Sequence, residues 1–426
     1  MVGPAKLNHF YLYLLGLSRG SALLASGLAH WDVDWQRPHR MHACASPIAI
    51  LALFLPLAAC VSYPAIPVTG YLANRRISTN VDSESAKDYL VASSKHSFAN
   101  ANDSERIAEI ERRFGQRPFD WLTLKEISRE TSPDFATIFL INHILSEHNN
   151  QRFQSAYAEE LQRIESLMHQ KKWTPVVRTS LKAYKILFIP GFHYLSDPAS
   201  GADFSGQRQL MHQLGLDVQL AAIAEDGSIE ENAAIIARLV RAESRNHSKL
   251  ILVSTSKGGP ETALALGKVL EPGETTSVKA WLSVGGLLRG TFLADCVMPW
   301  PKSWIARIIF SVEKIDFRSL PGLTTTASRT RMEGIRLPPH ILVLQYVAAP
   351  LSGDIADDVR ARYTYLRQYG PNDGLTLLAD ELLPHGITVL EPGLDHFYRD
   401  PEINLKSLAI ANLVAQELNV GSDIQR

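Results

Sequence analysis

The chain has 426 residues, 46% of them hydrophobic, which is enough to bury at least one sizeable core. Its 43 Lys and Arg residues balance 44 Asp and Glu residues, so it lacks the basic footprint of a nucleic-acid-binding protein. Three cysteines cannot build a disulfide scaffold. Paired-cysteine, His-Glu-x-x-His and Walker-type motifs are absent from the sequence, so we expect no metal site and no cofactor.

An uncharged apolar run, residues 48–60, ends at Cys60. It is too short to span a bilayer comfortably and has the length of the hydrophobic part of a signal peptide. Residues 57–60 (Leu-Ala-Ala-Cys) resemble the lipobox of bacterial lipoproteins, which implies that Cys60 is acylated and becomes the new N-terminus. We therefore expect residues 1–60 to be leader and signal peptide; the alternative is an ordinary buried apolar segment.

Two features bear on where this leader starts and where it directs the protein. Translation begins at Met1 or at Met41, and the shorter form has no Lys or Arg before the apolar run, unlike most signal peptides. Position 61 is Val and not Asp. By resemblance to Gram-negative lipoproteins, Val61 implies a lipid anchor in the outer membrane, facing the periplasm.

The stretch after Cys60 differs in composition from the rest of the chain. Residues 61–102 begin with a short proline-bearing segment and end in a run rich in Ser and Asn, which predicts a tether or linker. Residues 103–180 are predicted to form a helical N-terminal module, with a capped start at Asp103 and further helices near 133–148 and 151–171.

From Lys185 onward, short apolar runs alternate with helix-like stretches. Runs of this kind indicate a parallel sheet covered by helices on both faces, so residues 181–420 are predicted to be an α/β catalytic domain. Strands are expected at 185–191, 217–223, 249–254, 278–284, 341–347 and 387–390, and helices near 203–214, 228–246, 259–271 and 402–418.

Residues 250–263 (LILVSTSKGGPETA) join an apolar strand to a helix through Ser-x-Ser-x-Gly-Gly. A nucleophile elbow needs this arrangement, because the nucleophile, here Ser256, lies on a tight turn and small residues on either side let strand and helix pass closely. The first small residue is Ser254, where glycine is usual. The alternative is an ordinary strand-to-helix turn, including one that binds phosphate.

An acyl-transfer site also needs two backbone N–H donors for the oxyanion. Lys257 directly follows the candidate nucleophile, and Phe192 follows the flexible Gly191 after an earlier strand, so their N–H groups are the candidates. His193 is a competing candidate for the catalytic base, although we expect it to line the mouth of the pocket.

The preferred base is His396, because it follows the last strand and can reach back over the carboxyl edge of the sheet. Its acid partner is expected at Asp373, in a Gly-Pro-Asn-Asp-Gly turn, with Asp380 and Asp395 as alternatives. Each of these residues also has a purely local interpretation, since Asn-Asp-Gly is a common turn sequence.

Ser256, Asp373 and His396 occur in this order, each beyond a predicted strand, and in this they resemble the α/β-hydrolase superfamily over residues 185–418. The resemblance is to its lipase and esterase branch. It implies a serine hydrolase in which Ser256 attacks an acyl carbonyl, His396 takes the proton and Asp373 orients the imidazole. Two alternatives stay open: an acyltransferase on the same fold, and a catalytically silent envelope lipoprotein that acts as a binding module.

Residues 290–338, between two predicted strands, are rich in aromatic and apolar side chains and include Cys296. In this fold such an insertion usually lies above the active site as a lid, which would suit a hydrophobic ester or acyl substrate. The alternative is a pair of ordinary packing helices.

Overall fold

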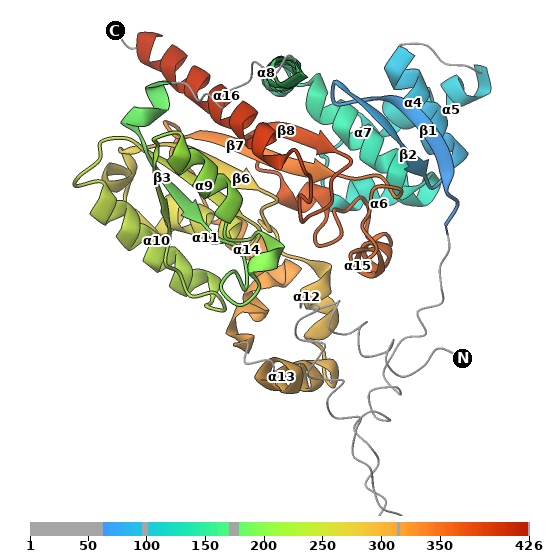
Figure 1. The fold of residues 1–426 in the computed structure, drawn as a ribbon. Helices are drawn as coiled ribbons and strands as arrows, with labels where there is room; N and C mark the ends of the chain where they lie inside the picture. The colour runs from blue at the N-terminus through green and yellow to red at the C-terminus, as the bar shows by residue number, and fades with distance from the viewer. Residues whose placement is uncertain (1–62, 96–100, 170–178, 313–315, 425–426) are drawn as a thin grey trace, which may run out of the picture. The chain divides into compact units, whose positions relative to one another are not determined.

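A six-stranded parallel sheet with the strand order β4-β3-β5-β6-β7-β8 forms the centre of the protein (Figure 1). The computed structural model describes residues 63–95, 101–169, 179–312 and 316–424. The predicted leader and Cys60 therefore lie outside the described residues. The strands are β3 (Lys185–Ile189), β4 (Asp217–Leu220), β5 (Leu250–Thr255), β6 (Val278–Val284), β7 (Leu342–Ala349) and β8 (Ile387–Pro392).

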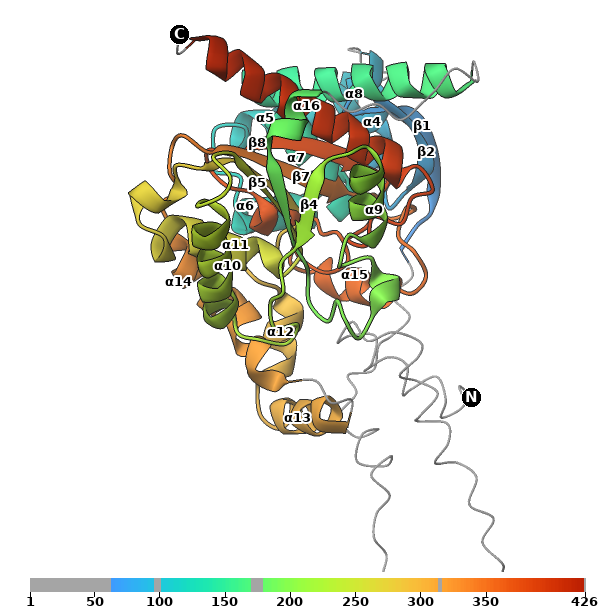
Figure 2. The same ribbon diagram turned by 60° about the vertical axis from the view of Figure 1, so that its left-hand side comes forward.

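Helices cover both faces of this sheet, as the alternating pattern predicted (Figure 2). Side chains of β3 alternate between the two faces: Leu187 and Ile189 join the core with α10 and α11, whereas Ile186 and Phe188 join the core with α8, α9 and α16. None of the described helices is both long and apolar enough to cross a membrane. The helices that cover the two faces of the sheet are α8 (His148–His169), α9 (Ser205–Gln213), α10 (Ile229–Glu243), α11 (Gly258–Leu264) and α16 (Ile403–Ile424).

Local sequence explains where these elements begin and why β5 is apolar throughout. All residues of β5 from Leu250 to Ser254 are buried, because a central parallel strand is covered on both faces. Helix α10 begins at a capping box, in which Ser228 accepts from the backbone of Glu231 and the Glu231 carboxylate accepts from the backbone of Ser228.

The segment predicted as a tether, residues 61–102, is instead folded over most of its length. It forms an antiparallel hairpin whose turn residues, Ala73 and Asn74, both have positive φ (48° and 62°), which suits a two-residue hairpin loop. Alternate residues such as Val68 and Leu72 are buried. The prediction of a tether was wrong because it rested on the prolines and not on the alternation of buried and exposed residues that is typical of a strand. The elements are β1 (Ile66–Leu72), β2 (Arg75–Val81) and α4 (Glu84–Lys95).

Helices fill most of residues 103–169, as predicted for that part of the segment, but they do not form a module separate from the sheet. Helices α5 to α7 share one apolar cluster with the hairpin and with Val347 of β7 and Leu390 of β8. Residues from Ala65 onward accordingly form one compact unit. Further bounds are α5 (Ala101–Phe114), α6 (Trp121–Glu130), α7 (Pro133–Ser146) and α15 (Arg360–Leu366).

The fully buried Asp134, at the start of α7, ties this N-terminal part to the sheet. Its carboxylate accepts from the backbone N–H of Asp82 (2.8 Å), from the N–H and hydroxyl of Ser352 after β7 (2.9 and 2.6 Å), and from the hydroxyl of Tyr363 (3.2 Å). Burial, reinforced by the neighbouring Asp82, raises the pKa of Asp134 to about 7. One side chain thus holds three segments that are distant in sequence.

Asp134→Ala is expected to lower the free energy of unfolding by about 2–4 kcal/mol, because it leaves several buried donors without an acceptor. Urea unfolding followed by far-UV circular dichroism measures this. The matched control is Asp357→Ala, whose side chain is 99% exposed, and it should change stability by less than about 0.5 kcal/mol. Equal losses in the two variants would show that Asp134 does not act as a structural tie.

Candidate active site

Ser256 follows β5 on a sharp turn whose geometry requires small neighbours. Its φ is 51°, in the left-handed region that non-glycine residues rarely adopt, and its N–H donates to the carbonyl of Val284 (3.1 Å). A Cβ at position 258 would lie 2.6 Å from the carbonyl oxygen of Pro190, so only glycine fits there. The spacing of small residues that the sequence showed is therefore set by close packing of strand, turn and helix.

Ser254, which stands where glycine is usual, has a specific partner. Its side chain is fully buried, and its hydroxyl accepts from the indole N–H of Trp281 on β6 (2.8 Å). Trp281 is also fully buried, so its N–H needs an acceptor that no water can supply. Serine in place of glycine at position 254 thus gives the buried Trp281 N–H an acceptor, and the turn keeps its conformation.

Three residues proposed from the sequence meet at the carboxyl edge of the sheet. Nε2 of His396 lies 3.1 Å from the Ser256 hydroxyl oxygen, and Nδ1 of His396 lies 2.5 Å from Oδ2 of Asp373. Oδ1 of Asp373 accepts from the backbone N–H groups of Leu375 (2.8 Å) and Thr376 (2.7 Å). With its proton on Nδ1 facing the carboxylate, the imidazole offers Nε2 as an acceptor to the serine hydroxyl.

The alternative acids are engaged elsewhere. Asp380 accepts from Arg329 (2.9 Å), and burial raises the pKa of Asp380. Asp395 accepts from the backbone of Phe397 (3.1 Å). Of the three aspartates considered, Asp373 is the one that lies against the ring of His396.

The loop that carries His396 is anchored by Tyr398, a residue that sequence reasoning missed. The Tyr398 hydroxyl donates to the carbonyl of Tyr346 (2.8 Å) and accepts from the N–H of Ala348 (2.9 Å), both on β7. Burial raises the pKa of Tyr398 well above its usual range, which keeps the hydroxyl protonated. No sequence signal marks this residue, because its partners are backbone atoms about fifty positions away.

The two proposed oxyanion donors flank the serine. A Cβ at Gly191 would lie 3.3 Å from Cβ of Ser256, so the loop that carries Phe192 passes directly beside it. Among the described residues, no acceptor takes the backbone N–H of Phe192 or of Lys257. Two N–H groups without an acceptor beside a nucleophile are what an oxyanion hole requires.

The side chain of Lys257 is buried beneath this turn. It forms an ion pair with Glu261, one helical turn later, and Glu261 also accepts from the amide of Asn232 (2.8 Å). Burial raises the pKa of Glu261 to about 7, although Lys257 opposes the shift. The pair fixes the first turn of α11 against α10.

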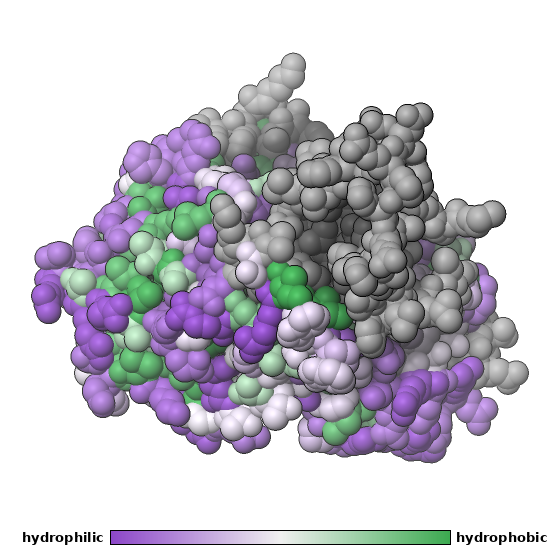
Figure 3. Space-filling model, turned by 90° about the horizontal axis from the view of Figure 1, so that it is seen from below, coloured by the Kyte–Doolittle hydropathy of each residue, from purple (hydrophilic) through white to green (hydrophobic). Residues whose placement is uncertain are grey.

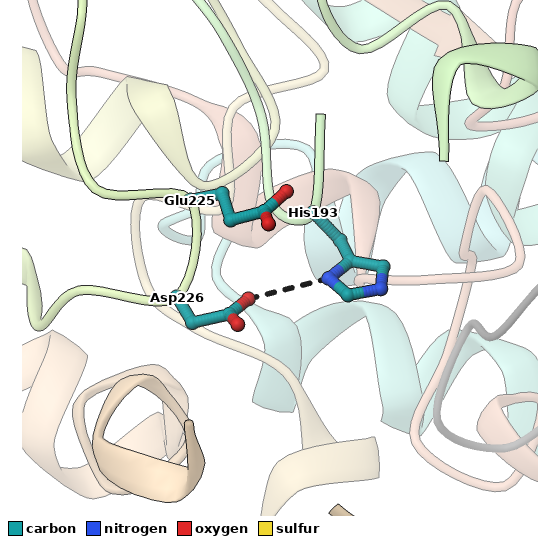
Figure 4. Close-up of side chains that lie close together, drawn as sticks. All are labelled: His193, Glu225 and Asp226. Atoms are coloured by element: carbon teal, nitrogen blue, oxygen red, sulfur yellow. Dashed lines mark hydrogen bonds and ion pairs between the residues drawn. The ribbon is translucent and has the colours of Figure 1, made fainter. Parts of the chain in front are cut away.

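His193 is directed at Asp226 (Figure 4), and the histidine that hydrogen-bonds the serine is His396. Its Nδ1 lies 3.3 Å from Oδ1 of Asp226, and this hydrogen bond raises the pKa of His193. The neighbouring Glu225 accepts from the N–H groups of Leu195 and Ser196 (both 2.9 Å). Ligand atoms of His193, Glu225 and Asp226 lie within 4.8 Å of one another, but protein donors already engage both carboxylates. The cluster is explained as a clamp on the loop that carries Phe192.

The insertion after β6 begins beside the acid-bearing turn. The hydroxyl of Thr376 donates to the carbonyl of Gly290 (2.7 Å), which joins the two segments. Trp300 and Trp304 in this insertion are 84% and 59% exposed. Seen from below, the surface of the protein carries hydrophobic residues between hydrophilic ones (Figure 3). The helices of the insertion are α12 (Phe292–Val297), α13 (Lys302–Val312) and α14 (Thr325–Glu333).

The strand order and the site together define the fold class. A parallel sheet with Ser256 after β5, Asp373 beyond β7 and His396 after β8 is an α/β-hydrolase fold, as the sequence predicted. No protein-family model and no curated protein matches the chain.

Solved structures to which the chain is similar match it at low sequence identity. A metagenomic carboxyl esterase is 22% identical, over 58% of this chain and 78% of its own, with a TM-score of 0.46. The mature lipase of Bacillus licheniformis is 20% identical, over 58% and 95% of the two chains, with a TM-score of 0.44. Lipase 1 from Pelosinus fermentans is 12% identical, over 56% and 98%, with a TM-score of 0.42.

Proposed function

We propose that the protein is a serine hydrolase that cleaves carboxylic esters through an acyl-enzyme on Ser256. The observation that carries the proposal is the continuous hydrogen-bond chain from the Ser256 hydroxyl through His396 to the buried carboxylate of Asp373. A nucleophile, a base within reach of it and a group that orients the base are the three parts that acyl transfer needs.

In the first half of this mechanism, Nε2 of His396 takes the hydroxyl proton as the Ser256 oxygen attacks the ester carbonyl. The imidazolium is stabilised by Asp373 and then protonates the departing alcohol. A water molecule, activated by His396 in the same way, hydrolyses the acyl-enzyme and frees the serine. The N–H groups of Phe192 and Lys257 would hold the oxyanion, each typically worth about 3 kcal/mol in the transition state.

Ser256→Ala is expected to lower turnover of short p-nitrophenyl esters by at least about a thousandfold, because it removes the nucleophile. The wild-type protein should also react with a fluorophosphonate probe, and the added mass should map to Ser256. Retention of more than about a tenth of wild-type turnover by a folded Ser256→Ala protein would exclude this serine as the nucleophile.

Asp373→Asn is expected to lower kcat by about three to four orders of magnitude, because an amide no longer holds the required imidazole tautomer. Asp380→Asn is the matched control, since Asp380 is paired with Arg329, and it should keep kcat within about tenfold of the wild type. The melting temperature of each variant shows whether it is folded. The acid assignment fails if the two variants lose the same activity.

The substrate class proposed is an ester with a hydrophobic acyl group, and residues 290–338 are proposed to act as a lid over it. The support is the exposed aromatic surface of Trp300 and Trp304, together with the hydrogen bond that joins Gly290 to the acid-bearing turn. Exposed aromatic side chains favour apolar ligands.

We propose in addition that Cys60 carries the lipid that anchors the protein in a bacterial envelope, in the outer membrane facing the periplasm. The support is the apolar run that ends in Leu-Ala-Ala-Cys. Mass spectrometry of protein purified from envelopes should find Cys60 as the acylated first residue. Cys60→Ala should lose the lipid and Cys296→Ala should keep it, whereas an unmodified N-terminus upstream of residue 60 would contradict the proposal.

A further inference from the structure

Glu381 is a buried carboxyl group that the proposed mechanism does not use. It ends a short 3-10 helix, Leu378–Glu381, and is 1% exposed. Its backbone carbonyl accepts from the amide of Gln345 on β7 (2.6 Å), and the same amide accepts from the N–H of Leu383 (3.0 Å). The position of Glu381 is therefore fixed, yet within the described part of the chain no donor reaches either of its two buried carboxyl oxygens.

Asp373 lies in the turn just before this short helix, closed by a bridge between Asn372 and Leu377, and its charge raises the pKa of Glu381. The two carboxyl groups therefore act on one another. A hydrogen bond between two carboxyl groups requires a proton on one of them, because two carboxylates both only accept. Asp373 already accepts from Leu375, Thr376 and His396, which favours its ionised form. The proton therefore belongs on Glu381.

The surroundings of Glu381 agree with this assignment. Burial raises the pKa of Glu381 well above its usual range, and the charges of Asp373 and Asp380 raise it further. Asp380 is itself paired with Arg329. Tyr398 also interacts with Glu381, and Arg289 donates to the backbone carbonyl of Ala379 in the same short helix (3.3 Å).

We propose that Glu381 is a positioning residue of the catalytic triad: its neutral carboxyl donates a hydrogen bond to Asp373 and holds that carboxylate toward His396. The catalytic meaning of this contact rests on the proposed function, but the contact itself does not. By sharing the negative charge of Asp373, the donor weakens the hold of Asp373 on a protonated imidazole. Its loss should therefore make His396 easier to protonate.

The test compares Glu381→Gln, which keeps a neutral donor, with Glu381→Leu, which keeps the volume and removes the donor. In the full-length protein with 13C-labelled histidine, the NMR titration of His396 is assigned by its absence in His396→Asn. Glu381→Gln should leave the midpoint within about 0.3 pH units of the wild type, and Glu381→Leu should raise it by about 0.5–1 unit. Glu159→Gln, on the exposed face of α8, is the control and should change nothing.

Two results would overturn the proposal. A lower midpoint in Glu381→Gln would show that Glu381 is ionised in the wild type, and an unchanged midpoint in folded Glu381→Leu would show that it does not act on the pair. Infrared difference spectra of wild type against Glu381→Gln provide a second measurement, since the carbonyl band of a protonated carboxyl should be present only in the wild type. This comparison does not depend on whether Glu381→Leu folds.

Activity separates this inference from the proposed function. With ester turnover as the readout, Glu381→Leu should lower kcat about tenfold at unchanged KM, and Glu381→Gln should stay within about threefold of the wild type. If Ser256→Ala keeps its turnover while the titration shifts appear as expected, the proposed function fails and the role of Glu381 stands. If turnover falls with Ser256→Ala but the His396 titration is the same in Glu381→Leu as in the wild type, the proposed function stands and the role of Glu381 fails.

Discussion

The site depends on a negative charge that the fold buries completely. Asp373 has no exposure to solvent, and an ion removed from water is tolerated only when close donors surround it. Two backbone N–H groups compensate one of its oxygens and His396 compensates the other. The hydrogen bonds that stabilise the buried charge of Asp373 also fix the orientation of the His396 imidazole. The stability of the buried carboxylate and the geometry of the site therefore have the same cause. Tyr398 anchors the loop that carries His396, and the hydrogen bond proposed from Glu381 would add a further donor to Asp373.

A second constraint is steric and acts at the nucleophile. Ser256 is held at a positive φ because the strand, the turn and the helix approach so closely that a Cβ at position 258 would meet backbone. Strain of this kind persists only where the surrounding structure over-determines it. The hydrogen bond of Ser256 to β6 and the buried Lys257–Glu261 ion pair provide this support from either side of the turn.

The N-terminal part of the described chain contributes by closing the sheet at β7 and β8. Asp134 joins the end of the hairpin to the loop after β7, and the apolar cluster of α4 to α7 covers the adjoining strands. Since β7 also provides the backbone that holds Tyr398, the hairpin and its helices stabilise the strand on which the histidine loop depends.

The sequence by itself determined the parallel sheet, the turn at Ser256 and the order of Ser256, Asp373 and His396, because local patterning and spacing encode buried strands and tight turns. It favoured Asp373 as the acid but left Asp380 and Asp395 open as alternatives, and it led to a wrong prediction of a tether where a hairpin lies. Tyr398 and Glu381 carried no signal at all. Which carboxyl meets the imidazole, and which stays protonated, follows from burial and from contacts between distant segments. Only the tertiary structure decides these, because a pairwise contact across the sheet leaves no periodicity in the chain.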